Sequence, residues 1–237
     1  MQKIFNCEMK MTSPLRAFVF DAYGTLFNVH SVVEACDAMF PGKGAALSQL
    51  WRTKQLEYSW LRSLMGRYVD FNQVTREALK YACKSMGLTY SEDLLSQLNA
   101  AYRTLALFDD AQPTLQQLRR QQPAVKCAIL SNGANDMLNA VVVHNKLDAM
   151  LDVVLSVDEV GIFKPDPRVY QLACDRLHLD RHEIGFVSSN GWDAAGAKTF
   201  GFTTFWINRA SAPVEELGVT PDRMLNSLTE LPPLLAM

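Results

Sequence analysis

The sequence lacks runs of basic residues: its 23 Lys and Arg stand against 25 Asp and Glu, for a formal net charge of -2. This balance argues against nucleic acid or an anionic membrane surface as the main partner, because both are bound through clustered positive charge. Nor is there a stretch of 18 uninterrupted apolar residues, so we expect no transmembrane helix. A small-molecule partner is the interpretation that these absences favour.

Cysteine is scarce and follows no pattern, with five widely spaced residues and no C-x-x-C pair. This usage argues against a disulfide framework and a zinc site, and it suits the reducing cytoplasm. The sequence also lacks a G-x-S-x-G nucleophile elbow and a glycine-rich phosphate loop. Residues 1–14 contain no apolar stretch of signal-peptide length, and we interpret them as an N-terminal extension.

Short apolar runs alternate with longer helix-like segments from about residue 110 onward. A strand-helix alternation of this kind predicts a parallel sheet with helices on both faces, that is, a Rossmann-like, doubly wound α/β core. One further run, "AFVF", lies far upstream of the others. The later runs are "CAIL", "VVLS", "IGFV" and "TTFWI".

The stretch between the first strand and the remaining ones contains no convincing strand. The segment "LSQLWRTKQLEYSWLRSLMGRYV" carries apolar side chains near helical spacing, and Gly87 and Ser91 mark the end of one helix and the start of another. We therefore predict an inserted helical subdomain. The expected parts are an extension (1–14), a core (15–27 and 109–237) and a helical cap subdomain (28–108).

Polar residues follow four of the predicted strands. Ligands of open parallel sheets bind beyond the carboxyl ends of the strands, so these residues are expected to meet at one edge. Asp21 follows the first strand directly, and Lys164 lies in the loop after "VVLS". A single polar residue here usually caps a helix or forms a turn, as we expect for Ser189, but the combination indicates a site. The other members are Ser131, Asn132, Ser188, Asn190 and Asp193.

Four segments carry a family resemblance: "FDAYGTLF", "ILSNG", "KPD" and "VSSNGWD" resemble the successive motifs of the haloacid dehalogenase superfamily, and of its L-2-haloacid dehalogenases in particular. The resemblance runs from Leu15 to about Leu228 and includes the helical segment. Four motifs in order are far more specific than a short D-x-x-G-T match. The resemblance implies a 2-haloalkanoic acid as substrate, and a homodimer.

The subfamily is indicated by acidic residues that this sequence lacks at two motif positions. Phosphatases of this superfamily place a second Asp two residues after the nucleophile and acidic Mg²⁺ ligands in the fourth motif. Here Tyr23 stands at the first position and Asn190 in the fourth motif, and Lys164 would compete with a cation for the site. A halide leaves without being protonated, which suits the loss of the acid. We therefore expect neither a metal nor another cofactor.

The mechanism implied by the resemblance is nucleophilic catalysis. Asp21, ionised at neutral pH because its ordinary pKa is about 3.9, would attack Cα of an L-2-haloacid and form an ester that water hydrolyses to the D-2-hydroxyacid. Lys164 and Thr25 would orient Asp21, Tyr170 would either orient Lys164 or pack a helix face, and Asp193 would activate the water. The substrate carboxylate would meet Ser131, Asn132 and the backbone of Ala22 and Tyr23, and the water would meet Ser188 and Asn190.

By resemblance Arg52 faces the reacting centre, where its guanidinium attracts the anionic substrate and stabilises the departing halide. From the residues alone it is one of several solvated cations on its helix. Thr53 stands where the family commonly has glutamine, which bears on the halide contacts, and Gly191 replaces a frequent alanine. The expected apolar halide pocket consists of Tyr23, Leu56, Phe71 and Trp192.

Two other functions stay open on these residues: a Mg²⁺-dependent phosphatase of the same superfamily, and a non-catalytic binding protein on this scaffold. Tyr23 and Asn190 argue against the first, and the retained Asp21, Thr25 and Lys164 argue against the second. The four histidines fall on predicted helices or at helix ends, so we expect surface or capping roles for them.

Overall fold

The structure is a computed structural model that describes residues 15–235 of the chain, so the expected extension at residues 1–14 lies outside the described residues. Six parallel strands form one sheet in the order β3-β2-β1-β4-β5-β6. The predicted Rossmann-like α/β core is confirmed. The strands are β1 (Ala17–Phe20), β2 (Lys126–Ser131), β3 (Val153–Ser156), β4 (Ile184–Ser188), β5 (Thr203–Ile207) and β6 (Arg223–Leu225).

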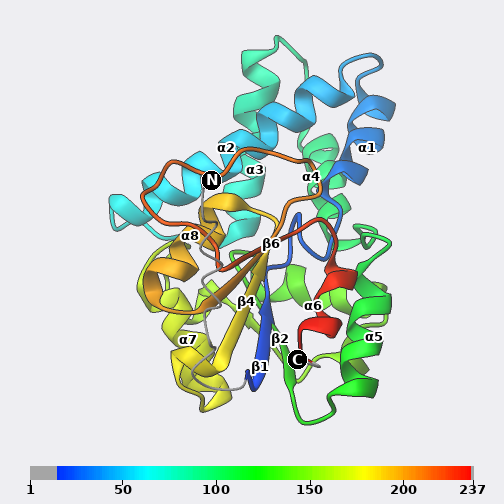
Figure 1. Ribbon diagram of the computed structural model, residues 1–237. Helices are drawn as coiled ribbons and strands as arrows, with labels where there is room; N and C mark the ends of the chain where they lie inside the picture. The colour runs from blue at the N-terminus through cyan, green and yellow to red at the C-terminus, as the bar shows by residue number, and fades with distance from the viewer. Residues whose placement is uncertain (1–14, 236–237) are drawn as a thin grey trace, which may run out of the picture.

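Helices cover both faces of the sheet, with α5 and α6 on one side and α7 and α8 on the other (Figure 1). This explains why the four residues of β1 are all buried and all apolar. The sequence analysis did not predict β6, which has three residues, two of them exposed. The covering helices are α5 (Ala111–Gln121), α6 (Asn135–His144), α7 (Pro167–Leu177) and α8 (Gly191–Phe200).

Four helices occupy the predicted insertion and lie together beyond one end of the sheet (Figure 1). The Ser91 side chain accepts from the backbone N–H of Leu94, and Gly87 follows α3 with a φ of 66°. Among residues 15–235, no helix is both long and apolar enough to cross a membrane. The four helices are α1 (Val32–Met39), α2 (Gly44–Leu64), α3 (Phe71–Ser85) and α4 (Glu92–Ala100).

The chain leaves the sheet for these helices and returns to it at one place. The backbone N–H of Asn28 donates to the carbonyl of Ala106 at 2.8 Å, and the N–H of Phe108 donates to the carbonyl of Leu26 at 2.9 Å. Between these bonds, one isolated antiparallel bridge joins the two connections. The outgoing and returning connections are therefore paired with each other.

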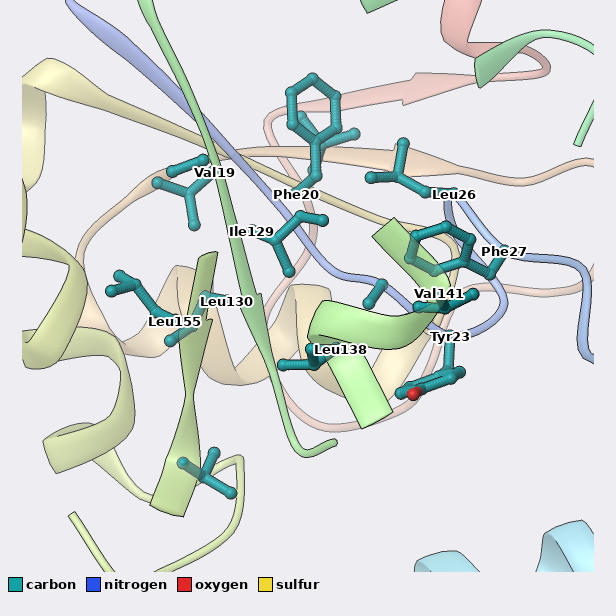
Figure 2. Close-up of a cluster of buried hydrophobic side chains, with 14 of the residues drawn as sticks. Val19, Phe20, Tyr23, Leu26, Phe27, Ile129, Leu130, Leu138, Val141 and Leu155 are labelled. Atoms are coloured by element: carbon teal, nitrogen blue, oxygen red, sulfur yellow. The ribbon is translucent and has the colours of Figure 1, made fainter. Parts of the chain in front are cut away.

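A buried apolar cluster lies beneath the loop that follows β1 (Figure 2). It draws side chains from β1, β2, β3, α6 and the loop after β1, and the ring of Tyr23 lies at its edge. Burial of this area stabilises the end of the sheet where the polar residues gather. The labelled members of the cluster are Val19, Phe20, Tyr23, Leu26, Phe27, Ile129, Leu130, Leu138, Val141 and Leu155.

Candidate active site

Asp21 is held at the carboxyl end of β1 by its backbone, whose N–H donates to the carbonyl of Val187 in β4 at 2.8 Å. The chain then turns sharply. The N–H groups of Thr25 and the next two residues all point to the carbonyl of Ala22, and Gly24 adopts a φ of 90° that favours glycine. This turn brings the Thr25 side chain back to the carboxylate of Asp21.

The two oxygens of the Asp21 carboxylate have different surroundings. Oδ2 accepts three hydrogen bonds, from Thr25 Oγ1 at 3.1 Å, Ser188 Oγ at 3.3 Å and Asn190 Nδ2 at 2.7 Å. Oδ1 accepts only one among the described residues, from Lys164 Nζ at 3.2 Å. Oδ2 is thus surrounded by donors, and Oδ1 is the oxygen whose lone pairs are free to react.

Lys164 lies between two carboxylates. Its Nζ is also 2.8 Å from Asp193 Oδ2, it faces the ring of Phe186 at 4.8 Å, and its side chain is 1% exposed. Burial acts to lower the pKa of Lys164, but the charges of Asp193 and Asp21 outweigh this and raise it. Lys164 is therefore an ammonium. Its backbone N–H donates to Asn132 Oδ1 at 2.9 Å, which fixes the start of its loop.

Asp193 is fully buried, and burial raises its pKa to about 6 against the opposing effect of the Lys164 ammonium. The hydroxyl of Tyr170 donates to Asp193 Oδ1 at 2.8 Å. We expected Tyr170 to orient Lys164 directly or to pack a helix face; its bond goes instead to the carboxylate that binds the lysine. A Cβ at Gly196 would lie 2.5 Å from the Tyr170 hydroxyl oxygen, so glycine is needed there for the close approach.

The expected substrate-binding groups border this cluster. Ser131 is buried and its Oγ accepts from the N–H of Gly133 at 3.1 Å, which does not use the hydroxyl proton. Within residues 15–235, the backbone N–H groups of Ala22 and Tyr23 donate to no protein acceptor. Two backbone donors are therefore free next to Asp21, as an anion-binding site requires.

The structure brings together part of the predicted halide pocket. The ring of Tyr23 stacks on that of Phe71 in α3, with centroids 6.3 Å apart, and its buried hydroxyl has no partner among the described residues. Burial raises the pKa of Tyr23, and the positive charges of Arg103 and Arg52 act against this rise. Trp192 meets Trp60 of α2 edge to face at 5.4 Å.

Arg52 and Leu56 lie one turn apart on α2, and both are partly exposed. Arg52 makes no salt bridge within the part of the chain that the structure describes, although Lys54 and Arg62 on the same helix do. An arginine without a carboxylate partner is available to an anionic ligand. None of the four histidines, at positions 30, 144, 178 and 182, forms a hydrogen bond to Asp21, Lys164 or Asp193.

Arg209 supports the site and was missed in the sequence analysis. Its guanidinium binds both oxygens of Asp110, at 2.7 and 3.2 Å, and donates to Ser189 Oγ at 2.8 Å and to the carbonyl of Thr25 at 3.1 Å. It thereby ties the loop after β1 to the loop after β4. Arg209 comes two residues after Ile207, the end of β5, so the rule that singled out the other strand ends would have found it.

The residues present do not fit a Mg²⁺ ion, the metal of phosphatases in the superfamily that the motifs resemble. Mg²⁺ takes oxygen ligands in an octahedron. The Lys164 ammonium is within 3.2 Å of both carboxylates of this site and supplies the positive charge that a metal would bring. The neighbouring Asn190 donates its amide N–H to Asp21, which leaves fewer lone pairs for a metal.

Known proteins resemble this chain in sequence and in fold. The family model of haloacid dehalogenase-like hydrolases matches residues 15–201. The chain is 52% identical to an (S)-2-haloacid dehalogenase of Pseudomonas sp. strain YL (90% of this chain, 91% of that protein) and 48% identical to one of Pseudomonas putida (92% and 96%). It is similar to the structure of an L-2-haloacid dehalogenase from Xanthobacter autotrophicus with covalently bound chloropropionic acid (TM-score 0.89, 42% identity, 94% and 98% covered).

Proposed function

Since the chain belongs to the haloacid dehalogenase-like hydrolases, and among them to the (S)-2-haloacid dehalogenases, we propose that Asp21 is the nucleophile with which it cleaves carbon–halogen bonds. The protein is a hydrolase that converts L-2-haloacids to D-2-hydroxyacids through a covalent intermediate. The observation that carries our assignment is the asymmetry of the Asp21 carboxylate, with three donors on Oδ2 and one on Oδ1.

In the first step, Oδ1 of Asp21 attacks Cα of the substrate from the side opposite the halogen. A carbon–oxygen bond forms, the carbon–halogen bond breaks, and the halide leaves with the bonding electrons, so the configuration at Cα inverts. The donors on Oδ2 hold the carboxylate in one orientation and leave Oδ1 to react. The ammonium of Lys164 contacts Oδ1 at 3.2 Å and helps to hold the carboxylate in place for the attack.

In the second step, water attacks the carboxyl carbon of the Asp21 ester. The carbonyl oxygen of that ester is Oδ2, and its developing negative charge falls among the donors of Thr25, Ser188 and Asn190. This arrangement supports an oxyanion hole for hydrolysis. We assign the proton of the water to Asp193, the other carboxylate on Lys164. The tetrahedral intermediate then collapses: the bond between the Asp21 carboxyl carbon and Oδ1 breaks, and the D-2-hydroxyacid leaves with Oδ1 as its hydroxyl oxygen and with the proton from Asp193.

The substrate itself is an anion next to an apolar pocket. We place its carboxylate on the free N–H groups of Ala22 and Tyr23 with the help of Ser131 and Asn132. The departing halide would lie near Arg52, whose charge offsets that of the halide in the transition state. The pocket walls would be Tyr23, Leu56, Phe71 and Trp192.

The covalent step is tested by one turnover in ¹⁸O-water with enzyme in excess. Because water attacks the carboxyl carbon of Asp21 and not Cα, the label should enter the peptide "AFVFDAYGTLF", and the product should carry unlabelled oxygen at C2. The Asp21→Asn variant is the control and should remain unlabelled in the same time. Product labelled at C2 in the first turnover, with an unlabelled peptide, would show direct attack by water and overturn the assignment.

We also propose that residues 28–108 act as a cap over a core of residues 15–27 and 109–237, and that two chains pair through the apolar end of α2. Leu64 is 84% exposed there and Met65 61%. Light scattering of the wild type should give twice the chain mass, and Leu64→Asp should halve it.

A cytoplasmic location is supported by the four free, buried cysteines among the described residues.

A further inference from the structure

Buried hydrogen bonds join α2 to α3 and to the turn that precedes the return to the core. Gln55 Nε2 donates to Thr75 Oγ1 at 3.0 Å, and the hydroxyl of Tyr102 donates to Gln55 Oε1 at 3.0 Å. The indole N–H of Trp51 donates to the carbonyl of Thr75 at 2.7 Å. All four residues are at most 2% exposed. Buried amide and hydroxyl groups are costly without partners, so this network strongly favours one arrangement of the helices.

The network holds the helix on either side of Arg52. Trp51 precedes Arg52 and Gln55 lies one turn further on, so both project from one face of α2, and both bind Thr75. Successive residues on a helix point about 100° apart, so a rotation of α2 that turned Arg52 away would break both bonds. The direction of the Arg52 side chain therefore depends on the hydrogen bonds that Gln55 makes.

Tyr102 links this network to the halide pocket. Its ring meets Trp51 edge to face at 5.1 Å and Tyr23 at 6.0 Å, while its hydroxyl binds Gln55. Burial raises the pKa of Tyr102 to about 12, and the positive charge of Arg52 acts against that rise. Tyr102 therefore contacts the helix of Arg52 and the wall of the pocket at the same time.

We propose that Tyr102 is a positioning residue for halide release: through its bond to Gln55 it sets the rotation of α2 and so aims Arg52 at the departing halide. The inference rests on the proposed function, in which Arg52 stabilises that halide. It adds that the carbon–halogen cleavage depends on Tyr102, whereas hydrolysis of the ester, which takes place among core residues, does not.

The test is Tyr102→Phe, which keeps the ring and removes the hydroxyl. Chloride release from L-2-chloropropionate in a single turnover should slow by about 10-fold, the scale of effect expected when a charged group is misplaced by a fraction of an ångström. Bromide release should slow less, because bromide leaves more readily and needs less help. Hydrolysis of the accumulated ester should stay within about two-fold of wild type.

Two further variants separate positioning from stability and from the role of Arg52. Val74→Ala creates a small cavity beside Thr75 without removing a hydrogen bond, so it should lower the melting temperature yet leave chloride release within about two-fold. Adding Tyr102→Phe to Arg52→Ala should slow release no further than Arg52→Ala alone.

Each contrary result has a distinct meaning. Unchanged chloride release in Tyr102→Phe, alongside a slow Arg52→Ala, would overturn the positioning role and leave the proposed role of Arg52 standing. Equal slowing in Val74→Ala, or additive effects in the double variant, would also overturn it. Unchanged release in Arg52→Ala would overturn both.

Discussion

Replacing Lys164 by methionine removes the ammonium that lies between two buried carboxylates while keeping a side chain of similar length. At an effective dielectric constant of about 20, a unit charge at 3.2 Å from Asp21 and 2.8 Å from Asp193 attracts them by about 5 and about 6 kcal/mol. Desolvation of the three groups offsets much of this attraction. Loss of one partner from a buried pair costs about 3–5 kcal/mol of unfolding free energy.

The loss of unfolding free energy in Lys164→Met grows as pH rises. The pKa of Asp193 is already raised to about 6 by burial, and loss of the ammonium raises it further, so the folded variant binds a proton at neutral pH. The unfolded chain releases that proton near its ordinary pKa of about 3.9. The variant therefore loses stability as pH rises through the folded pKa, and its deficit against wild type should be larger at pH 8 than at pH 5.

Thermal unfolding followed by circular dichroism measures this deficit. For a chain of this size, about 3–5 kcal/mol lowers the melting temperature by roughly 6–20 °C. Lys198→Met is the matched control, because Lys198 binds Asp222 at 2.5 Å with a side chain that is 34% exposed, and such pairs contribute less than about 1 kcal/mol. A Lys164→Met protein as stable as Lys198→Met at pH 8, or equally affected at both pH values, would refute the reasoning.

Three other outcomes follow from the site. Because Lys164 supplies the positive charge between the carboxylates, EDTA should not change the rate of halide release measured with an ion-selective electrode. Activity that disappears with EDTA and returns with Mg²⁺ would contradict this. Because one displacement inverts Cα once, chiral chromatography should find only the D-2-hydroxyacid from the L substrate, and a racemic product would count against attack from one face. Because Asp193 accepts a proton only when ionised, ester hydrolysis in single turnovers should accelerate as pH rises through about 6, and a flat profile there would remove Asp193 from the role of base.

The parallel sheet and the polar residues at its strand ends were predictable because they depend on local patterns. Each apolar run is long enough to indicate a buried strand, and a polar residue directly after it must lie at the carboxyl end of that strand. Asp21 and Lys164 therefore meet as expected, 3.2 Å apart. The strand β6 was missed because only one of its three residues is buried.

The partners of individual side chains were not predictable from the same patterns. Tyr170 lies 23 positions from Asp193, and Tyr102 lies 47 from Gln55, so nothing in the local sequence pairs them. The sequence analysis did not single out Gln55 or Thr75, yet both are fully buried. Such burial is decided by the packing of α2 against α3, which is a tertiary property.

The paired connections at Asn28–Ala106 and Leu26–Phe108 have a consequence for how this architecture can diversify. The two hydrogen bonds hold the ends of the insertion next to each other, where the chain leaves the sheet and returns to it. Closing a longer loop costs only about 0.6 kcal/mol for each doubling, so the sheet tolerates large changes in what is inserted there. Evolution can therefore exchange the helices at residues 28–108 as a block, while the residues at the strand ends stay where they are.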